Sequence, residues 1–247
     1  MKHWILGAAV LLAAYGARAG EVRVAAAADF VPTLTVLAQG FEKATGNRVL
    51  ISMGSTGKLY AQISNGAPFD VFLSADAKTP KRLVAEGFAV NGSRFTYAVG
   101  RLVLWSALPA EVDAHGAVLA RGGFSHLAIA NPATAPYGAA ARQVLAGLGL
   151  WHRLAGRIVD GENVGQTFQF VASGNAELGF VALAQVRAEA GAYHGSYWQV
   201  PQTLYRPLRQ QAVLLTAGAG NPAAVAFYRF LRSAPARSVI EAAGYGP

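Results

Sequence analysis

The sequence predicts an α/β protein with two lobes, each a mainly parallel sheet flanked by helices, and a cleft between them. Short apolar or β-branched runs alternate with stretches of helical periodicity along most of the chain, an order typical of parallel-sheet α/β proteins. This alternation occurs in the first hundred residues and again from Leu127, without repetition of the sequence itself. The chain has no cysteine, so its stability must come from the core, which a chain of this length can supply.

The N-terminus has the pattern of a secretory signal peptide over residues 1–19. Lys2 precedes an apolar run at 4–14, and Ala17-Arg18-Ala19 provides an A-x-A cleavage site. The run is shorter than the ~20 apolar residues of a spanning helix, and no later stretch approaches that length. We therefore expect an exported, periplasmic protein whose mature chain begins near Gly20.

The first lobe is assigned to residues 20–97 and 187–247. A strand at 22–26 precedes a helix in which apolar residues recur at helical spacing from Leu34 to Phe41, with Pro32 in its first turn and Gly46 at its end. The other elements expected in this lobe are strands at 48–53, 71–73 and 212–215, and helices that begin near 58 and 79 or span 222–232 and 236–243.

The second lobe is assigned to residues 98–186. It is expected to contain a strand at 127–130, a helix at 138–148 and a strand at 157–159. Two apolar segments, 95–105 and 178–186, are predicted to be extended crossings between the lobes, about which one lobe would hinge against the other.

Charge and motifs exclude several classes of protein. After removal of the signal peptide, 19 basic and 13 acidic residues remain, a balance compatible with an anionic ligand or with a well-solvated surface. No basic stripe interleaved with aromatics is present, which disfavours nucleic-acid binding. The chain has no G-x-S-x-G or H-E-x-x-H motif and no recognisable carboxylate pair. We therefore expect no catalytic residues and no enzyme activity.

Neither a nucleotide site nor a metal site bound directly by the protein is expected. Residues 52–59 loosely resemble a phosphate-binding loop, but Ser52 replaces its first glycine and Leu59 its magnesium-binding hydroxyl residue. The histidines that could bind a metal lack ligand spacing; they are His115, His126, His152 and His194.

Two expected strand-to-helix turns are candidates for an anion site, at 27–30 and 54–57. In open α/β sheets, ligands bind beyond the carboxyl ends of strands. Helix N-terminal amides favour anions there, and Gly54 and Gly57 allow close approach of the backbone to a ligand. Thr56 adds a hydroxyl donor. The alternative is that Ser55 and Thr56 only cap a helix, which such residues commonly do.

Several motifs, in their order and spacing over residues 22–245, resemble the periplasmic molybdate-binding proteins of ABC transporters, especially those of nitrogen-fixing bacteria. The segments that carry the resemblance are ISMGSTG at 51–57, NGAPFDVFLSAD at 65–76, FTYAVG at 95–100, NP at 131–132, APYG at 135–138, VGQ at 164–166 and LGFVALA at 178–184.

The resemblance implies a type II periplasmic binding fold that holds molybdate or tungstate through neutral donors, with the metal bound only as its oxyanion and no cofactor. An ABC transporter permease would be the partner of a monomeric binding protein. The ligand contacts would fall on Ala28 and Asp29 in the first turn, Thr56 in the second, the Tyr137 hydroxyl and the Val164 backbone amide.

The sequence departs from this family at two places. Ala182 occupies the position of a tyrosine in other branches, so Tyr137 would replace that tyrosine. Ala28 and Asp29 stand where a hydroxyl residue and an asparagine are expected.

The Asp29 carboxylate matters most for affinity. At ~4 Å from a dianion and an effective dielectric of ~20, it would be repelled by ~8 kcal/mol, the whole free energy of micromolar binding. We expect Asp29 to turn away and cap the following helix, offering only its backbone N–H. The alternatives are a protonated, donating carboxyl or a changed ligand.

Two other functions remain open at this point. One is an exported binding protein for another anion, such as sulfate, phosphate or a small carboxylate, which Ala28 and Asp29 make credible. The other is an exported hydrolytic enzyme on a similar scaffold, for which the sequence offers no nucleophile or metal site.

Overall fold

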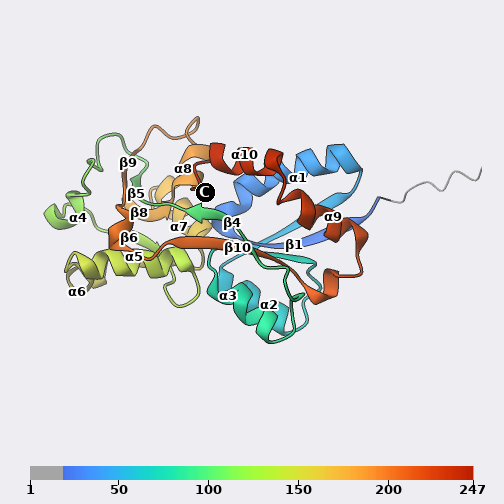
Figure 1. Cartoon of the computed structure of the whole chain (residues 1–247). Helices are drawn as coiled ribbons and strands as arrows, with labels where there is room; N and C mark the ends of the chain where they lie inside the picture. Colours follow the sequence, from blue (N-terminus) through green and yellow to red (C-terminus); the bar gives the residue numbers. More distant parts are fainter. Residues whose placement is uncertain (1–18, 247) are drawn as a thin grey trace, which may run out of the picture.

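The protein is described here by a computed structural model, which covers residues 19–246. The predicted signal peptide therefore lies almost wholly outside the described residues. Two five-stranded sheets form the two lobes, which lie side by side in Figure 1. No helix within the described residues is both long and apolar enough to cross a membrane.

The first lobe is built on a mixed sheet. Strand β1 lies parallel to β2 and β3, whereas β10 is antiparallel to β3 and β4. In spatial order, the strands are β2 (Arg48–Gly54), β1 (Glu21–Ala27), β3 (Val71–Ser74), β10 (Leu208–Leu214) and β4 (Phe95–Gly100).

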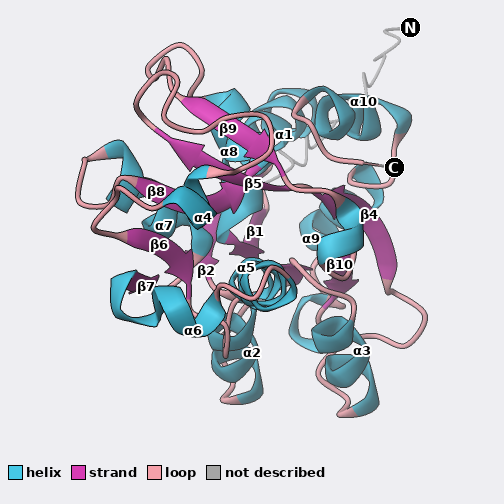
Figure 2. Cartoon of the chain, turned by 90° about the vertical axis from the view of Figure 1, so that its left-hand side faces the viewer, coloured by secondary structure: helices cyan, strands magenta, loops and turns pink. Residues whose placement is uncertain are grey.

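Helices cover both faces of this sheet, and alternate side chains of β1 point to opposite faces and pack in different cores. Val24 packs in the core under α1, α9 and α10, whereas Ala25 packs with α2 and α3; Figure 2 shows α2 and α3 together on one side. The helical elements of this lobe are η1 (Ala28–Phe30), α1 (Val31–Thr45), α2 (Thr56–Ser64), α3 (Lys78–Ala85), η4 (Thr216–Gly218), α9 (Pro222–Phe230) and α10 (Ala234–Ala242).

The second lobe has its own mixed sheet and a single large core. Within that core Trp105 stacks on Phe168, with ring centroids 4.5 Å apart. The strands, in spatial order, are β7 (Ile158–Gly161), β6 (Leu127–Ala130), β8 (Leu178–Ala182), β5 (Leu102–Ser106) and β9 (Ser196–Gln199). The helical elements are α4 (Val118–Arg121), α5 (Pro136–Gly147), α6 (Trp151–Leu154), η2 (Ala155–Arg157), α7 (Val164–Ala172), α8 (Leu183–Ala188) and, after β9, η3 (Gln202–Leu204).

The chain crosses between the sheets at two places, and only one of them was expected. Arg101 separates β4 of the first sheet from β5 of the second, in agreement with the predicted crossing at 95–105. The prediction for 178–186 was wrong, because β8 lies at the centre of the second sheet and α8 follows it.

The return crossing lies instead in residues 200–207, between β9 and β10. The sheets therefore divide the chain differently from the predicted lobe boundaries: residues 98–100 complete β4, and β9 pairs with β5 of the second sheet. Figure 1 shows β4 and β10 side by side in the middle of the molecule.

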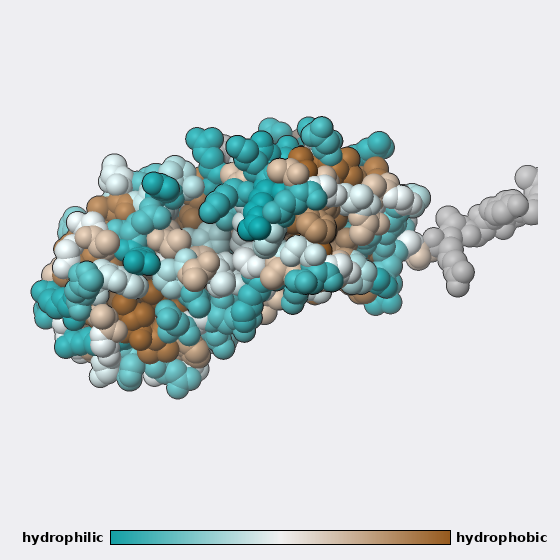
Figure 3. Space-filling model, turned by 90° about the horizontal axis from the view of Figure 1, so that it is seen from below, coloured by the Kyte–Doolittle hydropathy of each residue, from teal (hydrophilic) through white to brown (hydrophobic). Residues whose placement is uncertain are grey.

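The surface is mainly polar on the face shown in Figure 3, where apolar residues form small separate patches. Among the large apolar side chains of the described residues, Met53 is the most exposed, at 58%. This residue lies at the edge of the site described next.

Candidate binding site between the lobes

The carboxyl ends of four strands face one another across the interlobe boundary. Strands β1 and β2 of the first lobe lead into η1 and α2, and β6 and β7 of the second lead into α5 and α7. A small cavity lies where these turns meet. It is lined by Ala27, Ala28, Asp29, Gly54, Ser55, Thr56, Ala75, Ala135, Pro136, Tyr137, Asn163 and Val164.

The size and lining of this cavity restrict its ligand. Its volume is about 200 Å³, counting all the space between its lining residues and the adjoining solvent. Sugars, peptides and nucleotides need several hundred Å³. No lysine, arginine or histidine lines the cavity, whereas hydroxyl groups and helix N-termini do. The arrangement suits a small anion held by neutral donors.

In the first lobe, the second turn supplies two buried hydroxyl groups. Thr56 Oγ1 accepts the backbone N–H of Ala75 at 3.1 Å, so its own proton remains available to a ligand. Ser55 precedes α2 but does not cap it, and its buried Oγ has no hydrogen-bond partner. Since a buried polar group without a partner is unfavourable, Ser55 is a further candidate donor to an anion.

Tyr137 reaches the cavity from the N-terminus of α5. Gly138 allows this approach, because a side chain there would overlap the carbonyl group of Ala130 at the end of β6. The Tyr137 hydroxyl accepts Gln210 Nε2 at 3.3 Å and lies against Gly100. Burial and the neighbouring Asp29 raise the pKa of Tyr137 well above its usual value, so the hydroxyl keeps its proton for donation.

Val164 is the first residue of α7, and its backbone N–H is among those left without an intrahelical partner. Asn163 caps the helix, with its side-chain oxygen accepting the Gln166 N–H at 3.0 Å. Gln185 Nε2 donates to the Val164 carbonyl oxygen at 3.3 Å, and its Oε1 accepts the Ala182 N–H at 3.1 Å. Gln185 therefore fixes the peptide group that follows Val164, and the Asn163 cap holds the first turn of the helix.

Asp29 does not cap the following helix, so that prediction was wrong. Phe30 is the N-cap of α1 and no side chain caps it. The fully buried Asp29 carboxyl turns inward instead, because Gln210 Nε2 donates to its Oδ2. The Tyr245 hydroxyl lies 2.9 Å from the Asp29 carbonyl oxygen and 3.3 Å from Oδ2. The other carboxyl oxygen, Oδ1, has no partner.

Burial dominates the electrostatics of Asp29. Desolvation raises the pKa of its carboxyl from 3.8 to about 6, and the hydrogen bonds from Gln210 and Tyr245 offset part of the rise. No ion pair within the described residues involves Asp29. This carboxyl is therefore poised to change its protonation state when the charge of its surroundings changes.

Direct contacts hold the two lobes together around the cavity. The Gly57 N–H donates to the Thr134 carbonyl oxygen at 2.9 Å, and Lys58 Nζ lies 2.9 Å from Glu162 Oε1. Each contact joins α2 of the first lobe to a loop of the second lobe. The structure thus has the closed arrangement of the lobes.

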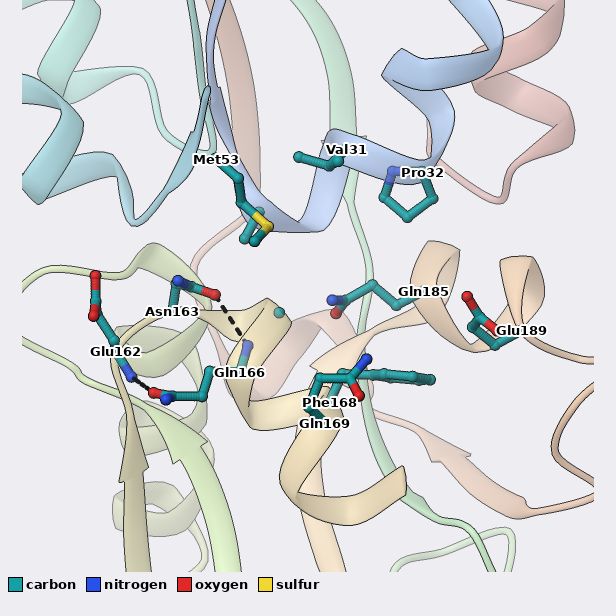
Figure 4. Close-up of a pocket in the computed structure, with 12 residues that line it drawn as sticks. Val31, Pro32, Met53, Glu162, Asn163, Gln166, Phe168, Gln169, Gln185 and Glu189 are labelled. Carbon is teal, nitrogen blue, oxygen red and sulfur yellow. Dashed lines mark hydrogen bonds between the residues drawn. The ribbon is translucent and has the colours of Figure 1, made fainter. Parts of the chain in front are cut away.

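Larger grooves adjoin the cavity. One has a volume of about 430 Å³ and shares Ala28 and Asn163 with the cavity. Figure 4 shows Met53, Val31 and Pro32 of the first lobe above Gln166 and Gln185 of the second. A second groove shares Thr56, Ala135 and Pro136 with the cavity. Separation of the lobes would open the cavity toward these grooves.

Comparison with known proteins places the chain in a family. A family model described as bacterial extracellular solute-binding protein matches residues 22–246. The chain belongs to this family. This solute-binding protein is 56% identical to the molybdate-binding protein ModA of Azotobacter vinelandii, over 98% of this chain and 95% of that protein. It is 49% identical to ModA of Rhodobacter capsulatus, over 96% and 93% of the two chains.

A solved structure supports the same placement. The periplasmic molybdate-binding protein of Azotobacter vinelandii superimposes on this solute-binding protein with a TM-score of 0.88 and 50% identity, covering 92% of this chain and 99% of that one. The sulfate-binding protein SubI of Mycobacterium tuberculosis, with a TM-score of 0.73 and 15% identity, shares the fold. The two-lobed periplasmic binding fold predicted from the sequence is confirmed.

All five residues predicted to contact the ligand line the one cavity: Ala28, Asp29, Thr56, Tyr137 and Val164. The prediction omitted Ser55 and Asn163, which also line it. The position of Ser55 in the Gly-Ser-Thr-Gly turn was a usable signal, because two hydroxyl residues begin the same helix. Among the described residues, no group of three or more His, Cys, Asp or Glu side chains could hold a metal ion.

Proposed function

We propose that this solute-binding protein binds molybdate or tungstate in the periplasm and delivers it to the permease of an ABC transporter. The observation that carries the proposal is the convergence of hydroxyl groups and helix N-termini from both lobes on a cavity without a cationic side chain. The printed names of the relatives in Azotobacter vinelandii and Rhodobacter capsulatus support molybdate as the ligand. The protein acts by binding alone, without catalysis.

The mechanism follows from the two sides of the cavity. In the open form, the oxyanion first meets the turns of the first lobe, where Ala28 and Asp29 offer backbone N–H groups and Thr56 its hydroxyl. Closure then adds the Tyr137 hydroxyl and the Val164 N–H from the second lobe. Hydrogen bonds to a charged acceptor are stronger than neutral ones, so several such donors replace the hydration shell of the dianion.

Release is compatible with this chemistry, because the anion is held without a countercharge. In the closed form, the two lobes together present the surface that a permease would recognise. Breaking the Gly57–Thr134 hydrogen bond would let the lobes separate and free the ligand. The signal-like N-terminus, with Lys2 and the run at 4–14, supports export of the monomeric protein to the periplasm.

The direct test is calorimetric titration of the mature protein, freed of bound anion by unfolding and refolding, with molybdate, tungstate, sulfate and phosphate. Tight binding of the first two, with little heat from the others, is the expected result. Tight sulfate or phosphate binding in place of molybdate would replace the proposed ligand with the other anion.

Tyr137→Phe tests the contribution of the second lobe. Loss of one hydroxyl donor to a charged ligand costs about 1.5–3 kcal/mol, so the Kd for molybdate should rise roughly 10- to 150-fold. His152→Ala, at an exposed position of α6 remote from the cavity lining, serves as the control. An unchanged Kd for Tyr137→Phe would exclude this hydroxyl from the site.

A further inference from the structure

The two carboxyl oxygens of Asp29 have different surroundings. Oδ2 accepts a hydrogen bond from Gln210 Nε2 and faces the Tyr245 hydroxyl at 3.3 Å. Oδ1 is equally buried but has no partner, although Asp29 lines the small cavity. A buried acceptor left without a donor is rare in folded proteins. Oδ1 is therefore the oxygen of this carboxyl that is free to form a hydrogen bond with a ligand in the cavity.

No positive charge balances this carboxyl. The titratable groups that interact with it are the hydroxyls of Tyr97, Tyr137 and Tyr245, each of which has a pKa raised well above its usual value. The turn that carries Asp29 packs against α1, α7 and α8, and none of these helices contributes a charged side chain to the groups that shift the pKa of Asp29. A dianion in the cavity would face an ionised Asp29 with nothing to screen it.

We propose that Asp29 takes up one proton from solvent when the oxyanion binds, so that its carboxyl becomes a hydrogen-bond donor to the ligand. The proton goes to Oδ1, because Oδ2 already accepts the Gln210 donor. No covalent bond to the anion forms: the dianion and one proton enter together, and both leave on release. The inference rests on the proposed function, since it needs a dianionic ligand.

Proton uptake couples affinity to pH. Burial raises the pKa of Asp29 to about 6. Above that pH the carboxyl is mostly ionised, so each binding event must take a proton from solvent, where protons become scarcer as the pH rises. The Kd should therefore rise about tenfold per pH unit, by the linkage between proton and ligand binding. Asp29 thus favours capture in slightly acidic surroundings and release in alkaline ones.

The experiment is calorimetry with molybdate between about pH 6.5 and 8.5, on the alkaline side of that pKa. Repeating it at one pH, in buffers of different ionisation enthalpy, counts the protons exchanged. Wild-type protein should take up close to one proton per molybdate. Asp29→Asn presents an amide donor in place of the protonated carboxyl, so it should bind at least as tightly at pH 8 and exchange almost no protons.

Thr56→Val is the matched control for damage to the cavity. It should weaken binding at every pH while keeping the same tenfold change per pH unit. A protonated-carboxyl infrared band that appears on molybdate binding to the wild type, and is absent from Asp29→Asn, would locate the proton without relying on affinity.

The outcomes separate the two proposals. Tight, pH-independent molybdate binding without proton uptake would overturn the role of Asp29 and leave the proposed function intact. Proton uptake that persists in Asp29→Asn would also overturn it, since the proton would then reside elsewhere. Absence of molybdate binding to the wild type at any pH would overturn the proposed function first, and this inference with it.

Discussion

Replacement of the buried Asp29 by asparagine should stabilise the ligand-free protein, and only above acidic pH. Burial raises the pKa of the Asp29 carboxyl from 3.8 to about 6. The folded protein therefore holds this proton more firmly than the unfolded chain. The stability from the protonated carboxyl is fully present below about pH 4 and is lost as pH rises through about 6. Asparagine keeps an acceptor for Gln210 without the ionisable group.

The magnitude follows from the shift. About two pKa units, at 1.36 kcal/mol each, correspond to about 3 kcal/mol. Urea unfolding of both proteins near pH 4, 5, 6 and 7.5 should show no stabilisation of Asp29→Asn at pH 4 and about 3 kcal/mol at pH 7.5. Subtracting the free energy of unfolding of the wild type from that of the variant at each pH removes the contribution of the other carboxyls.

Asp160→Asn, at an exposed position of β7, is the control for loss of one negative charge. It should not reproduce this dependence, because solvent screens an exposed charge. A difference between Asp29→Asn and the wild type that stays below about 1 kcal/mol and does not vary with pH would refute the argument from burial.

Three further substitutions test the cavity and the contacts that close it. Gly57→Ala places a methyl group 3.0 Å from the Thr134 carbonyl oxygen. It should strain the interlobe hydrogen bond and weaken ligand binding about three- to tenfold. Gly147→Ala is the control, because its methyl group meets nothing within 4 Å, and it should bind as the wild type in the same titration. Thr56→Val should raise the Kd for molybdate roughly 10- to 150-fold by calorimetry, and an unchanged Kd would remove this hydroxyl from the site. Lys58→Gln breaks a half-exposed ion pair and should raise the Kd by less than about fivefold, so a larger loss would mean that this pair controls closure.

Sequence patterns predicted the elements whose ends carry local signals. Helix α1 is an example, because Pro32 lies in its first turn and Gly46 adopts a positive φ of 74° at its end. The segment 178–186 was misinterpreted for an equally physical reason. A strand buried on both faces reads as a continuous apolar run, and periodicity cannot distinguish such a strand from a crossing or from the start of a buried helix.

The site was predictable in its location but not in its internal contacts. The turns at 27–30 and 54–57 follow expected strands, which places them at the correct edge of the sheet. The hydrogen-bond partners of Asp29 could not be predicted, because Gln210 and Tyr245 lie 181 and 216 residues further along the chain. No local pattern shows that these side chains converge on Asp29. The nearest hydrogen-bond donors in the sequence were the N–H groups of the following helix, so the carboxyl was predicted to cap that helix.

The position of β10 has a consequence for the order in which the protein folds. This strand lies between β3 and β4 in the first sheet, yet it comes from residues 208–214, near the end of the chain. The second sheet needs only residues 102–199 and can assemble before residues 208–214 have been synthesised. Until β10 arrives, β3 presents an open edge that another chain can pair with. The lobe whose synthesis begins first is therefore the last to complete its sheet, and it has the longest exposure to pairing with another chain.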